Sequence, residues 1–107
     1  MATWRERDTL WSFGWNNDGQ LGDGTATGRS SPIQVGSLTN WAEVACGFYH
    51  SVTRRTDGTL WTFGQNSSGQ LGDGTATGRS SPVQVGTLTN WADVAGGGYH
   101  SIAIQSI

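Results

Sequence analysis

The stretch Leu10-Trp11-Ser12-Phe13-Gly14 decides the fold, because it returns fifty residues later as Leu60-Trp61-Thr62-Phe63-Gly64. Outward from it, Gly19–Pro32 returns without change as Gly69–Pro82. A fixed period of this length indicates a stacked or radial array of small units. The repeat therefore has to be explained before any single residue is interpreted.

Each repeat is predicted to be all-β, because short apolar segments alternate with turn residues. The Asp57-Gly58 pair predicts a hairpin in which 49–55 and 59–63 are antiparallel neighbours. We expect further strands at 33–35, with Pro32 at the first strand position, and at 41–46. This gives about four strands per repeat.

We divide the chain into three parts by this period. They are a first repeat, residues 1–50, a second repeat, residues 51–100, and a C-terminal strand, residues 101–107.

Composition narrows the function classes. The 107 residues include 17 Gly and six Trp, only 13% are charged, and the net charge is −2. This composition argues against disorder, and without a basic field we expect neither nucleic acid nor membrane as a partner. The short apolar runs and the absence of a secretory signal favour a cytoplasmic or recombinant origin. The single cysteine, Cys46, excludes an intrachain disulfide.

A family resemblance adds to this reading. Residues 60–72, followed by Pro82 and by 94–101, resemble the repeat of the regulator of chromosome condensation family, and the first repeat matches equally well. The resemblance covers nearly the whole chain. It implies a β-propeller of four-stranded antiparallel blades, about seven to a ring in the usual case.

The resemblance also suggests an activity, since the family includes a nucleotide exchange factor for a small GTPase. We do not transfer it, because such a face needs different side chains from different blades, and these two repeats are nearly identical. Fold analogy is a weak basis for function.

Two blades are too few to close a ring, so each chain leaves two apolar blade faces in water. The strand at 101–107 lacks a hairpin partner, and the next segment of the right type is 10–14 of another copy. We therefore predict a homo-oligomeric ring of three or four copies, completed by strand exchange. Its interface residues are predicted to be Leu10, Trp11, Phe13, Ser101, Ile102, Ala103 and Ile104. Such regularity is typical of recent duplication or of an excised or designed fragment.

Residues 1–7 occupy the same place in the period as the start of the C-terminal strand. They fit it poorly, because Trp4, Glu6 and Arg7 replace Arg54, Thr56 and Asp57. We expect this segment to be displaced or to lie at the rim.

No arrangement of residues predicts catalysis, a cofactor or a metal, so we expect a structural protein rather than an enzyme. His50 and His100 are expected to be structural histidines that hydrogen-bond nearby backbone. An exposed Trp15 and Asp18, in the Gly-rich segment, are the candidate ligand contacts of an alternative function, a lectin-like or protein-binding module. Within that segment we expect Leu21 to pin the loop to the core and Asp23 to pair with Arg29.

Overall fold

The computed structural model describes residues 2–6, as backbone only, and residues 9–105. This part of the chain contains nine β-strands and no helix, so it has no helix that could cross a membrane. The strands are β1 (Ala2–Glu6), β2 (Thr9–Gly14), β3 (Arg29–Gln34), β4 (Trp41–Cys46), β5 (His50–Arg55), β6 (Leu60–Gly64), β7 (Arg79–Gln84), β8 (Trp91–Gly96) and β9 (Ser101–Gln105). The all-β prediction is confirmed.

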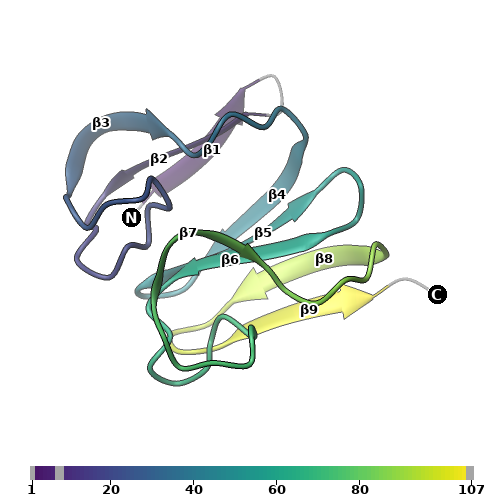
Figure 1. Ribbon diagram of the computed structural model, residues 1–107. Helices are drawn as coiled ribbons and strands as arrows, with labels where there is room; N and C mark the ends of the chain where they lie inside the picture. The colour runs from purple at the N-terminus through teal and green to yellow at the C-terminus, as the bar shows by residue number, and fades with distance from the viewer. Residues whose placement is uncertain (1, 7–8, 106–107) are drawn as a thin grey trace.

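The strands form three antiparallel sheets, which follow one another across the molecule in Figure 1. The N-terminal sheet has the order β1-β2-β3, the middle sheet β4-β5-β6-β7, and the C-terminal hairpin consists of β8 and β9. The middle sheet is one complete four-stranded blade. Its first strand, β4, comes from the first repeat, β5 begins at His50, the last residue of that repeat, and β6 and β7 come from the second. A blade therefore spans the boundary between sequence repeats.

The hairpin predicted around Asp57-Gly58 is present. β5 pairs with β6, Ser51 lies opposite Phe63, and Val52 lies opposite Thr62. Gly58 has a positive φ of 84°, and a Cβ there would collide with the Thr89 carbonyl group. Glycine is therefore required at this turn for both its backbone conformation and its small size.

The strand predicted at 33–35 begins earlier than expected, at Arg29 in β3. Pro32 is thus inside the strand instead of at its first position. The pairing of β3 with β2 is interrupted between Ser12 and Gly14, where the register shifts. Because β3 is an edge strand and Pro32 lies at this irregularity, no ladder hydrogen bond depends on the missing proline N–H.

The expectation that the first residues are displaced or lie at the rim is wrong for residues 2–6 of the single chain. β1 pairs with β2 from Ala2 to Glu6, and Trp4 lies opposite Trp11. In the second repeat the partner of Trp61 is Thr53, so β1 is one residue out of register with the fifty-residue period. An edge strand gains backbone hydrogen bonds from any extended partner, which explains why β1 pairs despite its different side chains.

Two apolar clusters form the core, one on each side of the middle sheet. The first contains Leu10, Val35, Trp41 and Phe63, and the second contains Val52, Leu60 and Val94. Leu10 and Leu60 occupy the same position of the repeat. The two clusters are therefore two copies of one blade-to-blade interface, and they differ in how completely they are filled.

Candidate strand-docking site

The first interface is complete, because Phe63 fills its centre. Phe63 is fully buried and packs against Leu10, Val35 and Trp41. A Cβ placed on Gly22 would lie 2.7 Å from the Phe63 ring, which is closer than real Cβ atoms come to other groups. Gly22 thus leaves the space in which the aromatic ring lies.

The second interface has the same lining but lacks this aromatic side chain. Gly72 is the counterpart of Gly22, and among the described residues only Val85 comes within 4 Å of a Cβ placed there, at 3.6 Å. The neighbouring residues are correspondingly less buried: Val35 is fully buried whereas Val85 is half-buried, and Trp41 is 2% exposed whereas Trp91 is half-buried.

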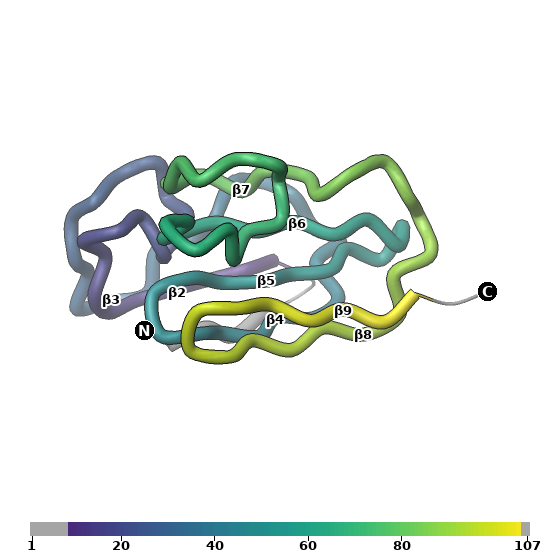
Figure 2. The backbone as a smooth tube through the Cα atoms, turned by 90° about the horizontal axis from the view of Figure 1, so that it is seen from below, coloured from purple at the N-terminus to yellow at the C-terminus, as the bar shows by residue number. Residues whose placement is uncertain are grey.

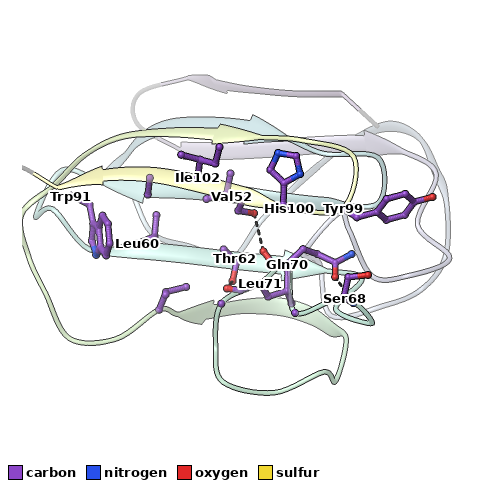
Figure 3. Close-up of a pocket in the computed structure, with 15 residues that line it drawn as sticks. Val52, Leu60, Thr62, Ser68, Gln70, Leu71, Trp91, Tyr99, His100 and Ile102 are labelled. Carbon is purple, nitrogen blue, oxygen red and sulfur yellow. Dashed lines mark hydrogen bonds between the residues drawn. The ribbon is translucent and has the colours of Figure 1, made fainter.

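A hollow of about 300 Å³ lies at this second interface. Figure 3 shows it between β9, which carries Ile102 and follows directly after His100, and the strand and loop that carry Leu60 and Leu71. In the middle sheet, β6 occupies the corresponding place beside β5. The hollow is therefore the place for a strand next to β9, and we name it the strand-docking site.

The predicted interface residues lie on both sides of this missing pairing. Ile102 and Ile104 are 58% and 59% exposed on β9, and Ser101 and Ala103 are half-buried. On β2, Leu10 is buried, and Trp11 and Phe13 are half-buried. In the single chain β2 and β9 belong to different sheets, and β2 is paired with β1 and β3.

His50 lies at the boundary between successive blades and is fully buried. Its Nε2 lies 3.1 Å from the carbonyl oxygen of His100 and 3.0 Å from Ser101 Oγ, so this nitrogen donates a hydrogen bond to the next blade. The prediction that His50 bonds nearby backbone is confirmed. His100 is exposed, and it would meet the same environment only beside a further blade.

Burial lowers the pKa of His50 below its usual value of 6.5, because desolvation disfavours the imidazolium. Its Nδ1 is buried and has no hydrogen-bond partner among the described residues, so a proton added there would be left without an acceptor. The folded chain therefore binds this proton less readily than the unfolded chain does.

We expect the melting temperature to be constant above about pH 6.5 and to fall as the pH is lowered from there toward 5, because the unfolded chain binds a proton that folded His50 resists. Thermal unfolding measured across this range tests the prediction. At dilutions where the chain is monomeric, H50Q should flatten the dependence and H100Q, at a residue exposed in the single chain, should not. Equal slopes for the two variants would contradict the assignment to His50.

The Gly-rich loops are internally bonded and structural. Asn66 Nδ2 donates to the carbonyl oxygens of Thr75 and Thr77, each at 3.0 Å, and its Oδ1 accepts from the Leu71 backbone N–H at 3.0 Å. Asn16 makes the same bonds in the first loop. The predicted roles of Leu21, which is fully buried, and of the Asp23–Arg29 pair, at 3.1 Å, are confirmed.

Asp73 closes the second loop with Arg79, at 3.0 Å. Burial by itself would raise the pKa of Asp73. Hydrogen bonds from Thr75, Arg79 and Asn66 outweigh it and lower the pKa to about 2. The carboxylate is thus part of the loop structure and is not a free acid for chemistry.

Replacing Asn66 with alanine should lower the free energy of unfolding by about 3 kcal/mol, because several buried backbone groups lose their partner together. Urea denaturation followed by tryptophan fluorescence measures this loss. S67A, at an exposed neighbour, serves as the control and should change stability by less than about 0.5 kcal/mol. A loss of similar size in both variants would mean that the loop is not held by the amide.

The candidate ligand contacts are not brought to one site. Trp15 is 57% exposed after the end of β2, as predicted. Asp18 lines a polar hollow of about 430 Å³ between the two Gly-rich loops, together with Asn66 and Ser80, and Trp15 does not line it. Both loops lie at the same end of the sheets in Figure 2.

Sequence reasoning missed two features. Gly22 looks like the other turn glycines, and its position against the Phe63 ring distinguishes it. An exposed aromatic group also went unnoticed, in which Phe48 makes edge-to-face contacts with Tyr49 and Tyr99, with ring centroids 6.4 and 5.7 Å apart. The described residues contain no group of three or more potential metal ligands.

Antiparallel sheets that pack face to face through the same positions of successive repeats define a β-propeller protein. Comparison with family models agrees with this class. The model of the regulator of chromosome condensation (RCC1) repeat matches residues 7–53 and 57–104, and a second RCC1 repeat model matches residues 41–70. The chain belongs to the RCC1 repeat family.

Solved structures support the same fold. Human WBSCR16 is 25% identical over 94% of this chain, with a TM-score of 0.80. Prp20p from Saccharomyces cerevisiae is 23% identical over 91%, with a TM-score of 0.78, and yeast RCC1 (Prp20) bound to Kap60 is 21% identical over 91%, with a TM-score of 0.70. The chain spans 28%, 27% and 25% of those chains. Comparison with curated protein sequences gave no match.

Proposed function

We propose that this protein is a non-catalytic propeller scaffold whose two-blade chains join copies of themselves into a closed ring. The observation that supports this most strongly is the strand count of the three sheets. The middle sheet has its four strands, whereas the N-terminal sheet has β1, β2 and β3 and the C-terminal hairpin has β8 and β9. β8 and β9 of one copy and β2 and β3 of the next together have the composition of one further blade.

The pairing in this shared blade follows the middle sheet. There, β5 pairs with β6, and by the repeat β9 would pair with β2 of the next copy. β1 has to leave β2 for this to happen. The exchange is favourable if β9 packs against β2 better than β1 does. β9 would pair in register with the repeat, whereas β1 is one residue out of register. A register difference of one residue reverses which side chains of a strand face the core.

Burial of apolar surface supplies the driving force for this assembly. Ile102 is 58% exposed, and its counterpart Val52 is 1% exposed where a neighbouring blade covers it. Each square ångström of apolar surface removed from water contributes roughly 25 cal/mol. Repeated head-to-tail contacts close into a ring, and two blades per chain allow about six blades from three copies or eight from four.

A disulfide trap tests the exchanged strand directly. By the pairing of Val52 with Thr62, Ile102 should lie opposite Ser12 of the next copy. In a Cys46→Ala background, S12C together with I102C should form chain-to-chain disulfides on mild oxidation, seen as a ladder on non-reducing gels. S12C together with the exposed N17C should not. Equal cross-linking of the two pairs would contradict this arrangement.

A second candidate is a binding module that uses the Gly-rich loops, as a lectin-like or protein-binding face. It is favoured by the exposure of Trp15 and by the polar hollow beside Asp18. Prp20p, described with its binding properties to Gsp1p and histones, provides a precedent for protein binding on this fold. Transfer of exchange-factor activity has less support, since identities below 25% indicate the fold only. Unaltered binding by W15A and D18A across glycan and protein panels would reject the loop-binding function.

A further inference from the structure

The strand-docking site has an internal template that identifies its occupant. At the first interface, a strand of sequence Leu-Trp-Thr-Phe-Gly, β6, lies beside β5 and places Phe63 over Gly22. At the second interface, β9 and Gly72 are in the corresponding places without such a strand. The matching sequence elsewhere in the chain is Leu-Trp-Ser-Phe-Gly of β2.

We propose that the strand-docking site receives β2 of a second copy, with Phe13 as the anchor side chain over Gly72. This inference rests on the proposed self-assembly and specifies how one copy recognises the next. Gly72 is then a specificity-determining residue, because any side chain there would occupy the space of the Phe13 side chain.

The aromatic lining supports the same occupant. Trp41 makes an edge-to-face contact with Trp61, with ring centroids 6.5 Å apart and an interplanar angle of 79°. Trp91 is the counterpart of Trp41 and lines the strand-docking site. Trp11 of the second copy would make the corresponding edge-to-face contact with Trp91. Both aromatic residues of β2, Trp11 and Phe13, would then have a partner in the strand-docking site.

A backbone hydrogen bond at the end of the strand-docking site also has a counterpart in the middle sheet. In the middle sheet the N–H of Gln65 donates to the carbonyl oxygen of Tyr49 at 2.8 Å. By the repeat, Trp15 of the second copy corresponds to Gln65, and Tyr99 corresponds to Tyr49. The N–H of Trp15 would therefore donate to the carbonyl oxygen of Tyr99, which lines the strand-docking site. This is strand addition to a free sheet edge, in which the backbone supplies affinity and the side-chain pocket supplies specificity.

Two glycine substitutions of equal backbone strain test the anchor. Gly72 and Gly86 have φ values of 70° and 68°, so alanine is disfavoured to a similar degree at both. A Cβ on Gly86, or on its counterpart Gly36, meets no described atom within 4 Å, whereas one on Gly72 would meet Phe13 of the second copy as Gly22 meets Phe63. Both variants should fold equally well as single chains.

The readout is the association constant of the purified chain, from light scattering over a dilution series, with thermal unfolding as the folding control. We expect G72A to associate about 10- to 100-fold more weakly than G86A. F13A should weaken association by more than about 100-fold. F13L combined with G72A should recover part of the loss.

Two outcomes would overturn the inference in distinguishable ways. If the unmodified chain forms a discrete oligomer and G72A and G86A associate equally, self-assembly remains supported and Phe13 is not its anchor. If the unmodified chain is monomeric at every concentration, both the anchor and the proposed self-assembly are wrong.

Discussion

Removal of residues 101–107 should convert the assembled protein into a monomer, so that the solution mass falls about three- or four-fold to that of one chain. The deletion takes away β9, which pairs with β8 and has no second neighbouring strand in the described part of the chain. Without it, β2 of the next copy has neither backbone partners nor the half-buried Ser101 and Ala103 against which to pack.

The shortened chain should remain folded, because the strand pairing of the middle sheet and its packing on the N-terminal sheet are kept. It loses the bond from His50 to Ser101 and the contact of Ala103 with the second cluster. Deletion of residues 106–107 only is the control and should leave the mass unchanged. Light scattering and circular dichroism measure mass and folding on the same samples. A shortened chain that keeps the original mass would show that the copies meet through another surface.

Replacement of Phe63 by alanine should lower the free energy of unfolding by about 3–5 kcal/mol, because the ring is fully buried and its removal leaves a cavity between two blades. The loss is a large part of the stability of a domain of this size. Urea denaturation of the monomeric 101–107 deletion variant measures it without interference from assembly.

Phe13 provides the matched control for Phe63. It occupies the same position of the repeat but is only half-buried in the single chain, so F13A should cost clearly less in the same monomeric background. Equal losses for F13A and F63A would mean that the N-terminal sheet buries Phe13 in some other way. The comparison separates folding of the chain from association of the copies.

Much of the fold follows from local sequence signals. The strand predicted at 41–46 is present with those bounds, and the Asp57-Gly58 turn gives the β5–β6 hairpin. Both rest on short-range chemistry, namely turn residues and alternation. The start of β3 was missed, because its pairing with β2 is irregular where Pro32 lies.

Burial could not be predicted from the repeat, because identical residues have different neighbours. His50 is fully buried and His100 is exposed, although both follow a tyrosine and begin the same segment. Similarly, the pairing of β1 depends on a free sheet edge and not on its own side chains. For the same reason the sequence did not single out Gly72. Its proposed role depends on a phenylalanine side chain beside it, and in the single chain such a side chain lies over Gly22.

The most direct test of the account is the solution mass of the unmodified 107-residue chain, measured by size exclusion with light scattering over a dilution series. The account predicts a discrete trimer or tetramer that dissociates on dilution without populating larger open chains. A stable, well-folded monomer at all concentrations would contradict it.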